Sequence, residues 1–193
     1  MAHREKRHEL TEKEFNHFKL KLASMMSDVD IKRYLGDNED YILRYCQLRN
    51  YNTIDELLPV NGSFKVILTE DSKNHGHWCC ILRQNNIIEW FDPIGVAPDY
   101  ELSFIPKSIK CCLGEDKHYL THLLKRANWL KVIWNKMKLQ RVAQGINTCG
   151  RHCVLRIILM KMGLNLKQFQ DIIQQEVEDT EMPSDVLVCD WIK

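Results

Sequence analysis

The sequence predicts an α+β domain in which a central mixed β-sheet is flanked by helices. Short apolar runs with strand-like alternation lie between residues 64 and 92, helical patterns lie on both sides of them, and an apolar helix follows the polar turn at residues 144–152. With 193 residues, 45% of them hydrophobic, the chain can bury a substantial core without a metal ion or a disulfide.

The N-terminal part of the chain is expected to be mainly helical. Thr11 and Glu14 form a capping-box pattern, which begins a helix that extends to about Met26. A short helix is expected over residues 28–35 and a brief helical turn over residues 53–56.

The sheet is expected to begin with an apolar strand over residues 64–69. A polar loop over residues 70–76 then leads to a β-hairpin, in which two apolar runs, residues 77–82 and 87–92, flank a short polar turn. Because side chains alternate across a strand, the position of the turn decides which residues of the two strands face one another.

The hairpin is expected to bring His77 and Asp92 together. If Gln84 and Asn85 are the central turn residues, His77 lies directly opposite Asp92. If Asn85 and Asn86 are central, Asp92 becomes the diagonal neighbour of His77. Both registers keep the two side chains on one face of the sheet and within reach of a hydrogen bond. An imidazole held by a carboxylate through one nitrogen can accept a thiol proton with the other.

After the hairpin the sequence indicates three helices and one strand. Residues 119–134 have an amphipathic helical pattern, and residues 138–142 are expected to form a strand. Residues 153–162 form an apolar helix, and residues 165–176 a last helix with a capping box at its start.

Cys149 lies in the polar, glycine-bearing turn at residues 144–152, at the start of the apolar helix. The first N–H groups of a helix are unpaired and carry about half a positive charge, which favours a thiolate over a thiol. Gly150 has no side chain, so we expect an open approach to the sulfur and backbone N–H groups close to a substrate carbonyl. Cys149, His77 and Asp92 together supply a nucleophile, a base and a group that orients the base.

This set of residues resembles the cysteine peptidase family that includes the adenovirus maturation protease and the SUMO/ubiquitin-like-protein proteases. The likeness rests on four features in a fixed order: a His-Trp pair that opens a strand, an Asp followed by a Pro-x-Gly turn, a Gln, and a Cys-Gly pair. In this sequence they are His77-Trp78, Asp92 with Pro93-Ile94-Gly95, Gln140 or Gln144, and Cys149-Gly150. The papain order differs, because there the cysteine comes first.

The resemblance implies a papain-like cysteine peptidase fold of the adenovirus and SUMO-protease type, with His77 as the base, Asp92 as the orienting acid and Cys149 as the nucleophile. A glutamine should donate a hydrogen bond to the oxyanion, together with backbone N–H groups near Cys149. In the family this glutamine usually lies six or seven residues before the cysteine. Gln144 lies five residues before Cys149 and is favoured on spacing, whereas Gln140 lies nine before it and remains the alternative.

The resemblance also implies roles for residues beside the triad. Trp78 is expected to pack next to the site, where it would shield the His/Asp pair from water, and Trp78 and Gly150 are expected to contact the substrate. The chain is expected to form one cysteine peptidase domain, residues 1–193, with a helical N-terminal part (1–60), a catalytic core (64–162) and a C-terminal helix and tail (163–193).

The implied activity is that of a cysteine endopeptidase, with the maturation of a viral precursor or polyprotein as the favoured role. Cleavage of ubiquitin-like modifiers by a deubiquitinase or deSUMOylase is the main alternative. An acetyltransferase effector ranks lower, since nothing in the chain marks a coenzyme A site. The expected partner is a protein substrate, either a viral structural precursor or polyprotein or a ubiquitin-like modifier, and no cofactor is expected.

A zinc-held interaction module is the alternative from a different class of function. His75, His77 and Cys79 lie close together on one strand, and His118 and His122 have the i, i+4 spacing with which a helix can chelate zinc. The chain has no Cys-x-x-Cys pair, which is the usual spacing of a zinc knuckle. We therefore expect no metal site.

Composition indicates the environment of the chain. Among the eight cysteines, Cys79-Cys80 and Cys111-Cys112 are adjacent pairs in apolar segments, which suits reduced thiols in a cytosol or nucleus better than a disulfide framework. Together with the resemblance, this implies a host cytoplasm or nucleus, or a virion, as the setting. No apolar run is long enough to span a membrane, and the basic start precedes a charged helix rather than an apolar signal core. The formal net charge is +1, so no global field indicates binding to nucleic acid.

Overall fold

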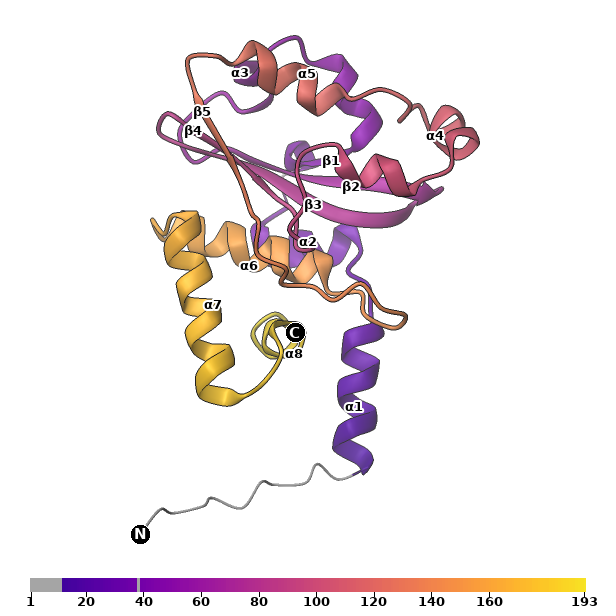
Figure 1. The fold of residues 1–193 in the computed structure, drawn as a ribbon, viewed down its shortest axis with the longest axis vertical. Helices are drawn as coiled ribbons and strands as arrows, with labels where there is room; N and C mark the ends of the chain where they lie inside the picture. The colour runs from indigo at the N-terminus through magenta and orange to yellow at the C-terminus, as the bar shows by residue number, and fades with distance from the viewer. Residues whose placement is uncertain (1–11, 38) are drawn as a thin grey trace.

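The fold is described for residues 12–37 and 39–193 of a computed structural model. Five strands form one sheet, and helices cover both of its faces (Figure 1). In spatial order the strands are β1 (Ile42–Arg44), β2 (Phe64–Ser72), β3 (His75–Gln84), β4 (Ile87–Phe91) and β5 (Lys131–Trp134). The outer pairs, β1/β2 and β4/β5, are parallel, and the two inner pairs are antiparallel. The predicted α+β class, a central mixed sheet flanked by helices, is confirmed.

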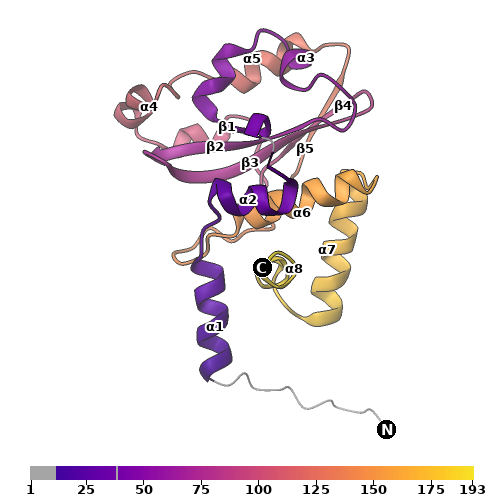
Figure 2. The ribbon, with the colours of Figure 1, turned by 180° about the vertical axis from the view of Figure 1, so that it is seen from behind.

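The helices form one layer on each side of the sheet. The α-helices are α1 (Glu12–Ala23), α2 (Asp28–Leu35), α3 (Ile54–Leu57), α4 (Lys107–Leu113), α5 (Tyr119–Arg126), α6 (Cys149–Lys161), α7 (Leu166–Thr180) and α8 (Ser184–Trp191). Three short 3₁₀ helices are η1 (Glu39–Tyr41), η2 (Tyr45–Asn50) and η3 (Tyr100–Phe104). Helices α2, α6, α7 and α8 lie on one face, and α3, α4 and α5 lie on the other (Figures 1 and 2). No described helix is long and apolar enough to cross a membrane.

The two faces of the sheet support two hydrophobic cores. Alternation along β3 places Trp78, Cys80 and Leu82 in the core shared with α6, whereas Cys79 and Ile81 belong to the core shared with α3 and α5. The helix that begins at Cys149 therefore packs against the same sheet that carries His77.

The N-terminal part of the chain agrees with the sequence in its short helices. Helix α2 has the predicted bounds, and a capping box between Ser27 and Asp30 begins it. Helix α3 begins after Thr53, whose hydroxyl accepts the backbone N–H of Glu56 at 3.2 Å. Helix α1 ends before Met26, and its predicted capping residues, Thr11 and the Glu14 side chain, lie outside the described part of the chain.

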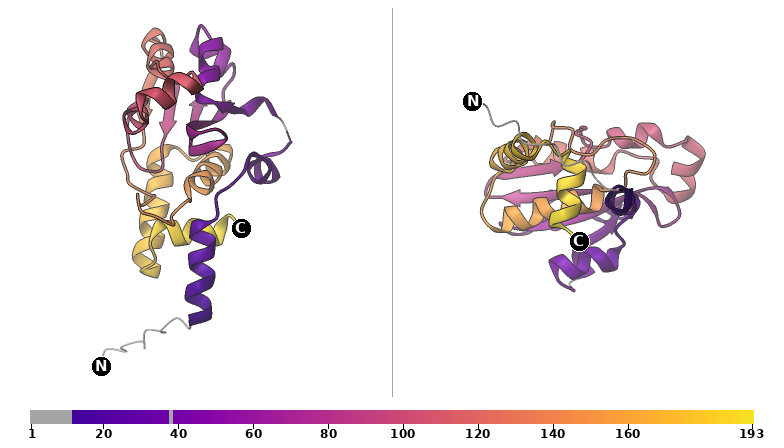
Figure 3. Two further views of the ribbon diagram at one scale, coloured as in Figure 1. Left: turned by 90° about the vertical axis from the view of Figure 1, so that its right-hand side faces the viewer. Right: turned by 90° about the horizontal axis from the view of Figure 1, so that it is seen from below.

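Residues 42–44 add a strand to the described N-terminal part of the chain, which is otherwise mainly helical. They form β1, which pairs in parallel with β2 at the edge of the sheet, and η2 follows directly. Helix α1 extends away from the sheet (Figure 3). Its Lys21 forms an ion pair with Asp190 of α8 at 3.0 Å. The N-terminal part of the chain thus contributes to the sheet as well as to the helical layer.

The hairpin adopts the second of the two predicted registers. Asn85 and Asn86 are the central turn residues, and Asn85 has φ 53°, a left-handed conformation that asparagine tolerates. Asp92 is consequently the diagonal neighbour of His77. The polar loop expected over residues 70–76 is mostly strand, because β2 continues to Ser72 and β3 begins at His75.

Two predictions after the hairpin were wrong. The helix expected over residues 119–134 ends at Arg126, and residues 131–134 form β5 instead. No regular strand forms over residues 138–142. The physical reason is that parallel pairing with β4 supplies backbone partners to residues 131–134, so tertiary structure overrides the local helical pattern.

The C-terminal part contains two helices rather than one helix and a tail. Asn165 caps α7 through a capping box with Gln168, as predicted, and α7 extends to Thr180. Helix α8 was not predicted. It begins after Pro183 and packs against α6 and α7.

Candidate active site

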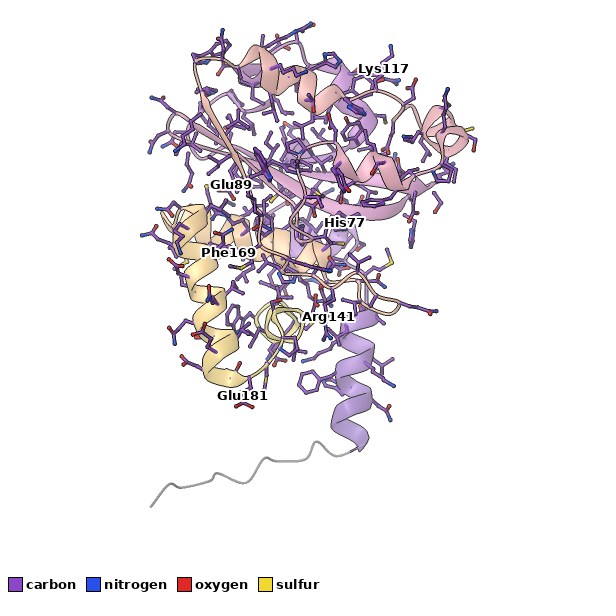
Figure 4. The ribbon with its side chains drawn as sticks, viewed as in Figure 1. His77, Glu89, Lys117, Arg141, Phe169 and Glu181 are labelled. Atoms are coloured by element: carbon purple, nitrogen blue, oxygen red, sulfur yellow. The ribbon has the colours of Figure 1, made fainter. Side chains whose placement is uncertain are left out.

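His77 and Asp92 form the expected pair. Asp92 follows β4 and is fully buried, and its Oδ1 lies 3.0 Å from Nε2 of His77. The same oxygen accepts the backbone N–H of Ile94 at 2.8 Å, and the side-chain amide of Asn135 donates to the Asp92 carbonyl at 2.7 Å. Figure 4 labels His77, which belongs to β3, the strand that packs against α6. Since Nε2 faces the carboxylate, Nδ1 is the nitrogen left to exchange a proton with a thiol.

Glu101 is a second acid at the same imidazole, and the sequence analysis did not include it. Its Oε1 lies 2.8 Å from Nε2 of His77, and its Oε2 accepts a hydrogen bond from the Cys79 thiol at 3.3 Å. Glu101 belongs to η3, in a segment without the periodicity of a helix or strand facing a core. The sequence therefore carries no local signal that could have identified it.

Burial and charge determine how the two acids and the imidazole share protons. Burial and the charge of Glu101 raise the pKa of Asp92 to about 6. Burial also acts on Glu101, but its contact with His77 outweighs this effect and holds the pKa of Glu101 below its ordinary value. Burial disfavours the charged form of His77, yet the negative charges of Glu101, Cys79 and Cys149 and the hydrogen bond to Asp92 raise the pKa of His77 well above its ordinary value. The site therefore favours an imidazolium.

Cys149 is the first residue of α6 and is 7% exposed. It lines a cleft of about 620 Å³, which His77 and Glu101 also line. A negative charge on Cys149 contributes to the raised pKa of His77, so the two groups are close enough to interact electrostatically. The structure thus brings Cys149 and His77 to one cleft, and Asp92 lies behind the imidazole.

Buried polar contacts hold the start of α6 in place. Thr148, directly before Cys149, donates its hydroxyl proton to Asp185 of α8. The other carboxylate oxygen of Asp185 accepts the backbone N–H of Arg141 at 3.0 Å. Arg151 donates to the carbonyl oxygens of Ser24 at 2.6 Å and Ile192 at 3.1 Å. These bonds fix both the helix start and the loop before it against α8.

The two candidate glutamines both line the cleft but differ in burial. Gln140 is 7% exposed, and its Nε2 donates to the carbonyl oxygen of Ile146 at 3.2 Å. Its backbone N–H donates to the carbonyl oxygen of Pro93 at 2.9 Å. No described residue donates to its Oε1. Gln144 is exposed, so of the two amides only that of Gln140 is fixed by its surroundings.

Trp78 and Gly150 pack against one another instead of lining the cleft of Cys149. The indole N–H of Trp78 donates to the carbonyl oxygen of Met26 at 2.9 Å. A Cβ at position 150 would lie 2.9 Å from Cβ of Met26 and 3.3 Å from Cδ1 of Trp78. The expected open space beside Gly150 is therefore filled, which corrects that prediction, because a glycine is needed here for close packing. Substrate contact by either residue stays a prediction.

The residues considered as zinc ligands divide into two groups. One ligand atom each of His77, Cys79, Asp92 and Glu101 lies within 4.8 Å of the others. Neither His118 nor His122 belongs to any such group within the described ranges. All eight cysteines are free thiols.

Comparisons with known proteins show a relative in sequence and a likeness to solved structures. The chain is 38% identical over 148 residues to uncharacterized protein V9 of Sputnik virophage, and the alignment spans 76% of this chain and 83% of that protein. Among solved structures it is similar to the C-terminal Ulp1 protease domain, determined in complex with Smt3, the yeast ortholog of SUMO, with 16% identity and a TM-score of 0.39. That likeness covers 96% of this chain and 98% of the Ulp1 chain. No protein-family model matches. By its identity to the virophage protein, the chain belongs to the family of uncharacterized protein V9 of Sputnik virophage.

Proposed function

We propose that this chain is a cysteine peptidase in which Cys149 is the nucleophile, His77 the base and Asp92 the acid that orients the base. One observation carries the proposal: an imidazole whose Nε2 faces a buried carboxylate at 3.0 Å lines the same cleft as a cysteine at the start of a helix. The acids around His77 favour an imidazolium, and the unpaired N–H groups at the start of α6 lie next to the sulfur of the proposed nucleophile.

The chemistry proceeds through a thioester. The proton of Cys149 passes to His77, and the thiolate attacks the carbonyl carbon of the scissile bond, so that an S–C bond forms. The C–N bond then breaks while His77 gives its proton to the leaving amine. Water attacks the thioester as His77 accepts one of its protons, and the proton returns to the sulfur when the acid product leaves.

Gln140 is proposed as the side-chain donor to the oxyanion. Stabilisation of a developing oxyanion requires a donor that is already in place, and the Gln140 amide is buried and held by Ile146. The backbone N–H of Cys149, at the start of α6, supplies the second donor. Gln144, although favoured by its spacing, is exposed and has to become ordered before it can act.

The proposed substrate is a viral structural precursor or polyprotein. The support is the family relation to a protein of a virophage. The proposed setting is a reducing compartment of the host, the cytoplasm or nucleus, or the virion itself. A ubiquitin-like modifier is the second candidate, since the Ulp1 domain, which this chain resembles, was determined in complex with Smt3.

Reactive probes test the proposal and separate the two substrates. Vinyl sulfones based on ubiquitin, on SUMO and on a short Gly-Gly peptide are offered to the wild type, to Cys149→Ala and to Cys153→Ala, a matched control that removes a buried thiol one turn further along α6. We expect the peptide probe to label Cys149 in the wild type and in the Cys153 variant. Labelling by the modifier probes alone supports the second candidate. An unlabelled wild type, or labelling that persists in Cys149→Ala, contradicts the peptidase proposal.

A further inference from the structure

Four ligand atoms of different chemistry meet behind the cleft. Nε2 of His77 lies 3.0 Å from Asp92 Oδ1 and 2.8 Å from Glu101 Oε1, and the Cys79 sulfur lies 3.3 Å from Glu101 Oε2. All four groups offer an atom within 4.8 Å of the others. Around a tetrahedral zinc ion, with bonds of 2.0 to 2.3 Å, neighbouring ligand atoms lie about 3.3 to 3.6 Å apart. Small side-chain shifts would bring the cluster to that geometry.

The cluster has more acceptors than donors. Its two carboxylates offer four oxygens, whereas three described groups donate toward them: one N–H of His77, the S–H of Cys79 and the backbone N–H of Ile94. Among the described residues, none donates to Oδ2 of Asp92, although this side chain is fully buried. A buried carboxylate oxygen without a donor is rare, and a bound ion is one of the partners that satisfies such an atom. This orphaned oxygen is independent of the ligand spacing and also points to a bound ion.

The chemistry of the four ligand atoms indicates which metal ion they would bind. A thiolate and an imidazole favour zinc over magnesium or calcium, and carboxylates complete many zinc sites. The ion can reach the cluster from solvent, because His77 and Glu101 line the cleft of about 620 Å³ and the His77 side chain is 22% exposed. Cys149 does not belong to the cluster, so this site is distinct from a metal held by the nucleophile.

We propose that His77, Cys79, Asp92 and Glu101 bind one Zn²⁺ ion, and that the bound ion switches the peptidase off. A zinc ion bound at Nε2 would displace the proton of that nitrogen to solvent and leave the second ring proton on Nδ1, the nitrogen that would otherwise accept the proton of Cys149. The Cys79 thiol releases its proton to solvent as its sulfur binds the ion. The zinc-bound imidazole can then neither accept the proton of a thiol nor donate a hydrogen bond from Nε2 to Asp92. Inhibition rests on the proposed function, whereas metal binding does not.

Cobalt absorption tests binding without reference to activity. Reduced, chelator-treated protein is titrated with Co²⁺, which gives a near-ultraviolet charge-transfer band only when a thiolate binds it. We expect saturation at one equivalent, loss of the band on addition of Zn²⁺, and its absence in Cys79→Ala. Cys80→Ala, which removes a buried thiol on the other face of the sheet, and Cys149→Ala should both retain the band. Glu101→Gln should weaken Co²⁺ binding by at least about tenfold, because even partners outside the ligand shell contribute about 10- to 100-fold and Glu101 is a direct anionic ligand in this proposal.

Each outcome decides between the alternatives. A band that survives in Cys79→Ala and disappears in Cys149→Ala places the metal on the nucleophile and overturns the proposal, as does the absence of a band in the wild type. If Cys79→Ala does not fold, as judged by circular dichroism, the Glu101→Gln titration decides. Zinc inhibition is measured in each variant relative to its own zinc-free rate, and Cys79→Ala should need about tenfold more zinc. A wild type that binds cobalt but has no peptidase activity refutes the proposed function and leaves the metal site standing.

Discussion

Nε2 of His77 has two carboxylate neighbours, and they come from different kinds of structure. Asp92 is held at the end of β4 by the N–H of Ile94 and by the amide of Asn135, which fixes its direction. Glu101 comes from η3, and its other oxygen accepts a hydrogen bond from the Cys79 thiol. The first acid therefore orients the ring through a rigid strand end, and the second adds negative charge that favours the imidazolium.

We predict opposite effects on kcat when the two candidate glutamines, Gln140 and Gln144, are replaced. Replacing Gln140 by Ala should lower kcat about 100-fold, because a preorganised oxyanion donor contributes this much to the rate. Replacing Gln144 by Ala, the matched control in the same cleft, should change kcat by less than about threefold, because an exposed amide is not preorganised. Hydrolysis of whichever substrate the probes identify is the measurement. A large loss in the Gln144 variant together with a small loss in the Gln140 variant would reverse the assignment.

The residues that sequence reasoning placed correctly are those whose positions depend on local geometry. The facing of His77 and Asp92 follows from strand parity, which holds in either hairpin register, and the placement of Cys149 follows from the start of a helix. Glu101, Gln140 and the filled space beside Gly150 depend on how loops and distant segments pack. No local pattern encodes such contacts.

At the scale of elements, a buried ion pair fastens α6 to β4. Arg156 donates to both carboxylate oxygens of Glu89 at 2.7 Å each, and both side chains are almost fully buried. The guanidinium also lies over the ring of Phe169, 5.4 Å from its centroid. Figure 4 labels Glu89 on β4 and Phe169 on α7. The pair thereby sets the position of the helix whose first residue is Cys149.

Breaking that pair should destabilise the fold. Glu89→Gln should lower the free energy of unfolding by about 3 to 5 kcal/mol, because it leaves a buried guanidinium without its counter-charge. The double variant Glu89→Leu with Arg156→Met should recover most of the loss, since it leaves no buried charge unpaired. Asp171→Asn, which breaks the exposed pair with Lys167, should cost about 0.5 kcal/mol or less and serves as control. Urea unfolding measures all three. Equal losses in the single and double variants would show that packing, not charge, holds this contact.

The elements that the sequence predicted well carry their own signals. Capping residues at Ser27, Thr53 and Asn165 mark the starts of α2, α3 and α7, because a cap satisfies backbone donors locally. Strands β1 and β5 lie at the two edges of the sheet and pair in parallel with segments distant in sequence. Their formation depends on those partners, so the local patterns missed β1 and assigned β5 to a helix.

At the scale of the whole molecule, the sheet separates two cores, and a buried acid lies at the margin of one of them. Glu115 follows α4 and is fully buried, and its carboxylate accepts the backbone N–H of Glu70 at 3.2 Å. Burial, together with the charge of Glu70, raises the pKa of Glu115 to about 7. The folded protein therefore binds this proton more tightly than the unfolded chain does.

Because folding changes the proton affinity of Glu115, the free energy of unfolding depends on pH. The contribution of Glu115 is fully present below its ordinary pKa of 4.5 and is lost as the pH rises through about 7. Glu115→Gln should raise the free energy of unfolding by about 1 to 2 kcal/mol at about pH 8, where the wild type must keep a charge buried, and should change it little at about pH 5. Asp116→Asn, at the exposed neighbouring position, should show no such difference. Thermal unfolding at the two pH values measures the effect, and a Glu115 variant that is equally stable relative to wild type at both would contradict it.

The proposed chemistry requires above all that Cys149 and His77 lie close enough to exchange a proton. The alkylation rate of individual thiols tests this most directly. Wild type and His77→Ala are treated with iodoacetamide at about pH 6, and modification of each cysteine is followed by mass spectrometry. Cys111 and Cys112 are exposed and serve as internal standards of ordinary reactivity. Although Cys149 is 7% exposed, it should react about tenfold faster than either standard in the wild type and more slowly than both in His77→Ala. A Cys149 that reacts more slowly than the exposed thiols in the wild type, or at the same rate with and without His77, would contradict the account.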